Sequence, residues 1–74
     1  MLKRTRHEVR ADILRVAAGG AIKTRIVYDA YLNFSIVKKY LADLIADGRL
    51  VQNGKKYFTT PRGLEYIAHV EAVS

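Results

Sequence analysis

The strongest constraint on the fold is the stretch between residues 33 and 48, because helix signals stand at both of its ends. Asn33 is a favourable N-cap residue, since its side-chain oxygen accepts a hydrogen bond from an unpaired amide of the first turn. Gly48 supplies the left-handed conformation that commonly ends a helix. The sequence therefore predicts a helix over residues 34–47. Its apolar residues recur at helical spacing and predict an inward stripe of Phe34, Val37, Leu41, Leu44 and Ile45.

Two further helices are predicted on the N-terminal side of this stretch. Thr5 and Glu8 have capping-box spacing ahead of a periodic apolar pattern, which predicts a helix over residues 6–18. Thr24 is expected to cap a short helix over residues 25–31. A helix that short depends on its neighbours for stability.

A β-hairpin and a last helix are predicted on the C-terminal side. Asn53 and Gly54 form a strong hairpin-turn signal between two short β-prone segments. Thr60 and Pro61 then provide an N-cap and a favourable first helical residue for a helix over residues 61–73. The predicted order is helix, helix, helix, strand, strand, helix.

This order predicts a winged helix-turn-helix. A short helix, a tight turn and a longer helix form the helix-turn-helix, and a hairpin directly after them is a wing. No linker or repeat interrupts the chain, so we expect one domain, 1–74, mostly α with a small β-hairpin. The helix over 34–47 is then the recognition helix, which enters the major groove of DNA with its N-terminal half. The wing, residues 52–57, is expected to lie on the DNA backbone.

Charge and composition narrow the function. Lysine and arginine total 13 against 7 acidic residues, and a formal net charge of +6 on so small a domain favours polyanionic partners. The absence of cysteine excludes disulfides, thiolate metal sites and a cysteine nucleophile. The two histidines do not have metal-ligand spacing, and no nucleophile–base pair, carboxylate pair or phosphate-binding glycine loop is present. We expect no enzyme activity, no metal, no cofactor and no small-molecule substrate.

The sequence also predicts the compartment. It contains neither a signal peptide nor an apolar stretch long enough to span a membrane. We expect a cytoplasmic, nucleoid-associated protein with no membrane partner.

DNA contacts are assigned by position. Polar and basic residues occupy the N-terminal part of the outer face of the recognition helix, alanines follow, and acidic residues stand at its far end. The alternative is a solvated face, and lysines near a hairpin also guard exposed strand edges. The expected contacts are Lys23, Thr24, Arg25, Asn33, Ser35, Lys38, Lys39, Lys55 and Lys56. Lys3, Arg4 and Arg6 form a possible N-terminal arm that follows the backbone or enters a minor groove; the alternative is a frayed terminus.

Three segments together resemble the small archaeal winged-helix DNA-binding proteins associated with chromatin and transcription. They are TRHEVRADILRVA, KTRIVYDAYLNFSIVKKYLADLIADGRL and YFTTPRGLEYI. The most specific parts are the Lys23-Thr24-Arg25-Ile26 run, Tyr40-Leu41, and Thr59-Thr60 followed by Gly63. The resemblance implies sequence-tolerant or regulatory binding to double-stranded DNA, and homodimers. It also adds Ile36 to the expected contacts, at a position where the family often has a polar residue.

The last helix carries two apolar stripes. The stripe of Leu64, Ile67 and Ala68 is expected to face the domain's own core. The stripe of Tyr66, Val70 and Val73 is then expected to form a homodimer interface. The alternative is that Tyr66 and Val70 fold under the first helix.

Two other functions compete with DNA binding. Winged helices also serve as protein-interaction adaptors, and a basic domain of this size can bind RNA. Steep loss of binding with salt favours a nucleic acid over a protein partner.

Overall fold

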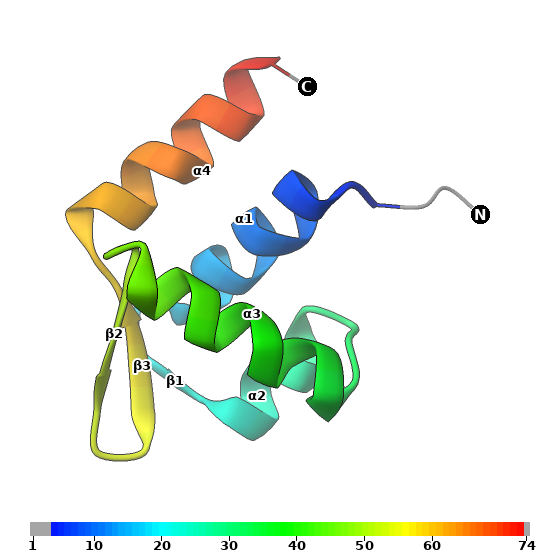
Figure 1. Cartoon of the computed structure of the whole chain (residues 1–74), viewed down its shortest axis with the longest axis vertical. Coiled ribbons are helices and arrows are strands. Elements are labelled where there is room, and N and C mark those ends of the chain that lie inside the picture. The colour runs from blue at the N-terminus through cyan, green and yellow to red at the C-terminus, as the bar shows by residue number, and fades with distance from the viewer. Residues whose placement is uncertain (1–3, 74) are drawn as a thin grey trace.

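The computed structural model describes residues 4–73, and its elements follow the predicted order with one added strand (Figure 1). Its helices are α1 (Arg6–Ala17), α2 (Lys23–Asp29), α3 (Phe34–Ala46) and α4 (Pro61–Val73). Its strands are β1 (Ala21–Ile22), β2 (Leu50–Asn53) and β3 (Lys56–Thr59). The expected fold class, a mostly α winged helix with a small hairpin, is confirmed.

The ends of α1 and α3 follow from the capping signals. Thr5 and Glu8 form the complete capping box ahead of α1. Asn33 Oδ1 accepts a 2.8 Å hydrogen bond from the Ile36 amide at the start of α3. Gly48 has φ 75° beyond the end of α3, and its amide donates to the Ile45 carbonyl while the next amide, of Arg49, donates to Leu44. This is the Schellman arrangement, which satisfies the last carbonyls of a helix.

The prediction for α2 was wrong at both ends. The helix begins at Lys23, two residues earlier than expected, so Thr24 lies within its first turn and the N-cap is Ile22, without a side-chain cap. The physical reason is that Ile22 belongs to β1, and the extended strand leads directly into the helix. The helix ends at Asp29 because Tyr31 adopts φ 55°, in the left-handed region.

The sheet has three antiparallel strands in the order β1-β3-β2, where a two-stranded ribbon was expected. The added strand was missed because it is only two residues long; Ala21 is paired with Tyr57. Gly20, just before it, has φ 90°, and a Cβ there would lie 2.5 Å from Cε1 of Phe58. The hairpin turn also differs by one residue, because Asn53 pairs with Lys56 and the two-residue loop is Gly54-Lys55.

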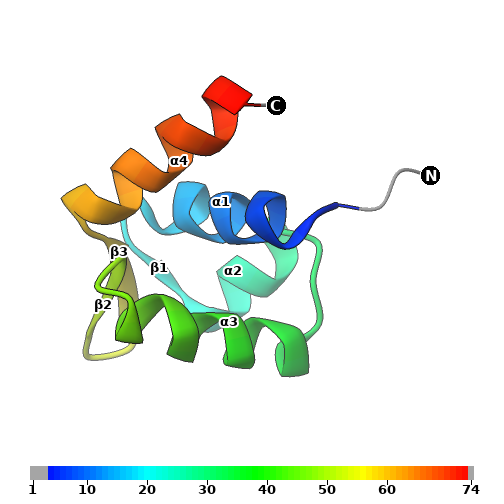
Figure 2. The ribbon, with the colours of Figure 1, turned by 45° about the horizontal axis from the view of Figure 1, so that its top comes forward.

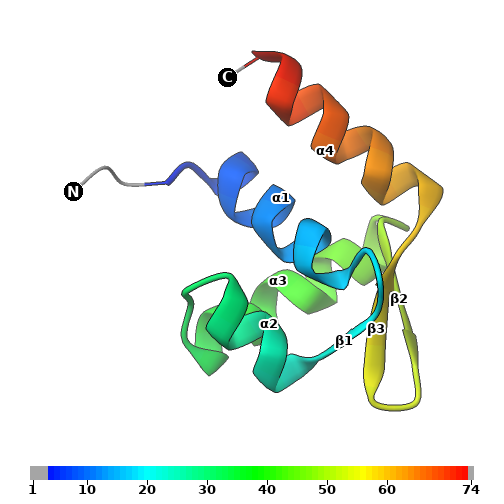
Figure 3. The same ribbon diagram turned by 180° about the vertical axis from the view of Figure 1, so that it is seen from behind.

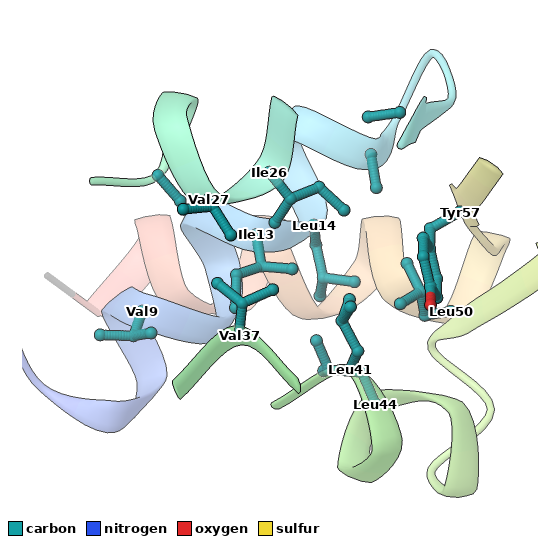
Figure 4. Packing of buried hydrophobic residues seen from close by; sticks show 13 residues of the cluster. Val9, Ile13, Leu14, Ile26, Val27, Val37, Leu41, Leu44, Leu50 and Tyr57 are labelled. Carbon is teal, nitrogen blue, oxygen red and sulfur yellow. The ribbon is translucent and has the colours of Figure 1, made fainter. Parts of the chain in front are cut away.

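The core is built around α1, which lies between α4 on one side and α2 with α3 on the other (Figure 2). Its largest fully buried side chains come from α1, α2, α3 and β2, as the close view shows (Figure 4). They are Ile13, Leu14, Ile26, Val37, Leu44 and Leu50. Each contributes about 1.5–3 kcal/mol relative to an exposed position. Seen from behind, the hairpin extends from one end of this body, beside β1 (Figure 3).

The inward stripe of α3 is narrower than predicted. Val37, Leu41 and Leu44 are buried, but Phe34 and Ile45 are 53% and 39% exposed. Both instead line the surface between α3 and the hairpin.

The orientation of α4 also differs from the prediction. Val70 is 6% exposed and Tyr66 packs against the core, whereas Leu64 is 50% exposed. Of the stripe predicted to face the core, Ile67 does pack against it. The Tyr66 hydroxyl forms a 2.8 Å hydrogen bond with Nδ1 of His7, and the Arg49 guanidinium lies 4.5 Å from its ring centre. The stripe assigned to a second subunit therefore faces α1 of the same chain. Of that stripe, Val73 remains largely exposed.

Candidate nucleic-acid interface

A continuous concave surface lies between α3 and the hairpin, and we call it the α3–wing groove. It consists of two adjoining hollows of about 320 and 230 Å³, which share Lys23, Gln52 and Tyr57. The residues that line it come from β1, the start of α2, α3 and the hairpin. They are Ile22, Lys23, Thr24, Phe34, Lys38, Leu41, Ala42, Ile45, Gln52, Lys55 and Tyr57.

The groove is positive because its charged side chains are all lysines. Lys23, Lys38 and Lys55 line it, and no carboxylate does. Two other hollows on residues 4–73 mix the two signs: Arg49 and Arg62 lie with Glu65 in one, and Arg6, Arg10 and Lys39 lie with Asp43 in the other. A concave surface lined by one sign of charge focuses its potential and attracts the opposite charge.

The lysines and the arginines of the domain differ in ion pairing. None of the five lysines within residues 4–73 forms an ion pair, and all five lie on α2, α3 or the hairpin. Arginines make every ion pair of this part of the chain: Arg4 and Arg15 with Asp12, Arg15 with Glu71, Arg25 with Asp29, and Arg49 with Asp47. Of the cations in this range without an ion pair, Lys23, Lys38 and Lys55 line the groove, whereas Arg6, Arg10 and Lys39 line a hollow on the other flank of α3.

The two adjacent lysines of α3 are not equivalent. Lys38 faces the groove, beside Ala42 and Ile45. Lys39 instead lines a hollow on the opposite flank with Arg6, Arg10, Tyr40 and Asp43. Successive helical residues point about 100° apart, so one helix presents the pair to two surfaces. Asp43 offsets part of the charge only on the Lys39 side.

The hairpin supplies one further cation to the groove. Lys55 occupies its two-residue loop, and the Gln52 side chain donates a 3.1 Å hydrogen bond to the Gly54 carbonyl, which braces that loop. Lys56 pairs with Asn53 on one side and Ile22 on the other. It lies outside the residues that line the groove.

The remaining assigned contacts have distinct environments. Thr24 and Lys23 line the groove, but the Arg25 guanidinium is paired with Asp29 at 3.1 Å. Asn33 uses its side-chain oxygen as the cap of α3. Ser35 and Ile36 are exposed on the first turn of that helix.

The expected N-terminal arm is held against the domain at Arg4. Its guanidinium forms a 2.8 Å ion pair with Asp12 and donates to the carbonyls of Ala30 and Tyr31. Arg6 begins α1 and lines the Lys39 hollow. Lys3 lies outside the described residues.

Apolar residues of the groove were missed as site residues by sequence reasoning. Phe34 and Ile45 were placed in the core because they continue an apolar period. Ile22 was not assigned to any element, and Tyr57 was treated only as a strand residue. The period alone could not separate them from the core, because the five-residue stripe spans about 100° of the helix, the ordinary width of a core-facing stripe.

Residues 4–73 differ from a metal site and from a membrane span. Within them, no group of three or more histidine or acidic side chains lies close enough to hold a metal ion. No helix in this range is long and apolar enough to cross a membrane.

The helix-turn-helix, the hairpin after it and the basic groove between them define a winged helix-turn-helix domain. The family of that name matches residues 3–74, and the chain belongs to it. Among known proteins, the chain is 39% identical over 62 residues to the uncharacterized protein MJ0287 of Methanocaldococcus jannaschii. That match covers 82% of this chain and 64% of the relative, so the chain spans less than two thirds of the relative's length.

A solved structure is also similar over almost the whole chain. It is Sso10a-2, described as a DNA-binding protein from Sulfolobus solfataricus, with 32% sequence identity and a TM-score of 0.86. The match covers 95% of this chain and 78% of that one.

Proposed function

We propose that this chain binds double-stranded DNA, with the N-terminal half of α3 in the major groove and the wing on the backbone. The observation that carries the proposal is the α3–wing groove with its three lysines and no carboxylate. A helix and an adjacent hairpin are the two elements by which winged helices dock on a duplex. The DNA-binding description of Sso10a-2, which shares the fold, supports the same conclusion.

The five lysines are expected to contact different parts of the DNA according to their positions. Lys38 projects from α3 toward the groove and is the best-placed cation for a base edge or a phosphate at its rim. Lys23, at the start of α2, and Lys55, in the hairpin loop, line one hollow beside Phe34 and contact phosphates of the DNA backbone. Lys56 and Lys39 add charge outside the groove and raise affinity for any sequence.

The biological role that fits this chemistry is a transcriptional regulator or a nucleoid-associated protein of archaeal type. Such a protein acts in the cytoplasm, where the chromosome lies. A homodimer would present two copies of α3 to a twofold-related site. Because Tyr66 and Val70 pack within the chain, the interface of such a homodimer would use the exposed side of α4, including Val73.

The test is binding to a labelled DNA duplex, followed by fluorescence anisotropy across a salt series. Replacing Lys38 and Lys39 together by alanine is expected to weaken binding about tenfold and to lower the salt slope by about one for each lost phosphate contact. Of the single variants, Lys38→Ala should account for most of the loss, because Lys39 lies beside Asp43.

The matched control is Arg62→Ala. It removes one positive charge, as Lys38→Ala does, but from a hollow on α4 that also contains Glu65. Equal losses for Arg62→Ala and Lys38→Ala would mean that only net charge matters and would contradict the assigned interface. An RNA duplex of the same sequence serves as competitor: binding equal to or tighter than that of DNA would favour the RNA-binding alternative. Salt-insensitive association with a protein would favour an adaptor.

A further inference from the structure

The side chains that α3 presents have very limited hydrogen-bonding capacity toward bases. Arginine or lysine can pair with guanine in the major groove, and asparagine or glutamine with adenine. From residue 34 to residue 46 the helix contains no arginine, asparagine or glutamine, and Asn33 already uses its oxygen in the cap. Lys39, Tyr40 and Asp43 line the opposite flank of α3, so its polar side chains on the groove side reduce to Lys38, with Ser35 exposed on the first turn.

Apolar side chains occupy the place that paired hydrogen-bonding groups usually take. Phe34 is the first residue of α3, is 53% exposed and lines the groove. Ile45 and Ala42 line the same groove two to three turns further along the helix and are exposed too. Exposed apolar surface framed by lysines matches a ligand that combines apolar groups with negative charge.

The major groove of DNA contains one such combination. The C5-methyl group of thymine is the only apolar substituent on the base edges there, and phosphates border the groove on both sides. Recognition helices contact base edges with their N-terminal residues, and Phe34 holds that position in α3. Phenylalanine and alanine are among the side chains that contact the thymine methyl.

We propose that the domain discriminates DNA by apolar contact between Phe34 and thymine methyl groups, with Ala42 extending the contact along the groove. The inference rests on the proposed DNA binding and adds a base preference to it. Lysine contacts with phosphate set the overall affinity, and the Phe34 ring favours A·T pairs that place a methyl group against it.

The experiment compares two duplexes that differ only in that methyl group. One has alternating A·T and T·A pairs, and the other has deoxyuridine in place of every thymine. Burying one methyl group corresponds to about a fourfold change in affinity, so the thymine duplex is expected to bind at least about fourfold more tightly. The salt slopes should be equal, because the phosphates are unchanged.

Variants then locate the contact. Phe34→Ala should lose most of the preference for the thymine duplex and retain the salt slope, with Ala42 accounting for any remainder. Leu64→Ala is the matched control, because Leu64 is 50% exposed on α4 and lies outside the groove. It should keep the thymine preference. A circular dichroism spectrum checks that each variant is folded. The comparison of the thymine and deoxyuridine duplexes with the wild-type protein needs no variant.

A second methyl comparison separates the methyl group from other properties of uracil. Replacing cytosine by 5-methylcytosine in a mixed-sequence duplex puts a methyl group at the same place in the major groove, and wild-type affinity should rise. Equal wild-type affinity for the thymine and deoxyuridine duplexes, with steep salt dependence for both, overturns the methyl contact and leaves DNA binding intact. Loss of the preference in Leu64→Ala but not in Phe34→Ala also overturns it. Absence of salt-dependent binding to every duplex overturns the proposed function itself.

Discussion

Replacing Gly63 by alanine tests how α4 is attached to the rest of the domain. Gly63 is in the first turn of α4, where its amide donates a 3.1 Å hydrogen bond to the Thr60 hydroxyl. A Cβ at this position would overlap the backbone carbonyl oxygen of Arg49 and lie 2.5 Å from Cγ2 of Thr59. That carbonyl cannot move freely, because it accepts a 3.1 Å hydrogen bond from the Thr60 amide.

Two opposing effects set the change in unfolding free energy caused by Gly63→Ala. Alanine is favoured over glycine within a helix by about 1 kcal/mol, so helix propensity alone predicts a more stable protein. Forcing an extra carbon into a filled, rigid contact costs about 1–3 kcal/mol, and more where backbone must shift. Because the atom in the way is backbone, we expect the clash to exceed the propensity gain and Gly63→Ala to lower the unfolding free energy by about 1–2 kcal/mol. For a domain of this size that corresponds to a melting temperature roughly 4–16 °C lower.

Thermal unfolding followed by circular dichroism measures the change, with Gly19→Ala as control. A Cβ at Gly19 would have no atom within 4 Å, and its φ is not positive. Gly19→Ala should therefore raise stability by about 0.4–1 kcal/mol through the unfolded chain. A Gly63→Ala protein that melts at or above the temperature of Gly19→Ala would refute the close contact between α4 and Arg49.

Three further variants probe other contacts. Val70→Ala should lower the unfolding free energy by about 1.5–3 kcal/mol at every protein concentration, because Val70 packs within the chain; a loss that vanishes on dilution would place it between subunits. Tyr66→Phe removes the hydrogen bond to His7 and should cost about 0.5–1 kcal/mol in chemical unfolding, with no loss when His7 is already alanine. Lys55→Ala combined with Lys56→Ala should weaken binding to all duplexes about equally, and selective weakening for particular base pairs would make the hairpin a base reader.

Local signals in the sequence determined most of the fold. The caps at Thr5, Asn33 and Thr60 fixed the starts of three helices, because each side chain satisfies an amide a few residues away. Gly48 fixed the end of α3 for the same kind of local reason. Signals of this sort depend on neighbouring residues only, so they can be interpreted without knowing the tertiary structure.

The features that sequence reasoning missed depend on distant partners. Strand β1 exists because Tyr57 and Lys56 of β3 lie beside residues 21 and 22, and two residues alone carry no strand periodicity. The observed start of α2 differs from the predicted start because strand β1 leads directly into the helix. In α4, two apolar stripes were visible, but which of them faces α1 depends on Gly63, whose missing side chain lets the helix approach Arg49 closely. Once Gly63 faces inward, Val70 does too, since seven residues are close to two helical turns.

The same dependence on tertiary context governs the candidate site. Lys38 and Lys39 were equivalent in the sequence, and only the neighbours of α3 separate them, with the hairpin on one flank and Arg10 with Asp43 on the other. Phe34 was grouped with the core because its period fits, yet its ring is 53% exposed and lines the groove beside the hairpin. A ring exposed to that degree stabilises the fold less than a buried one does. The methyl comparison tests the proposed role of this ring more directly than the removal of any charge does.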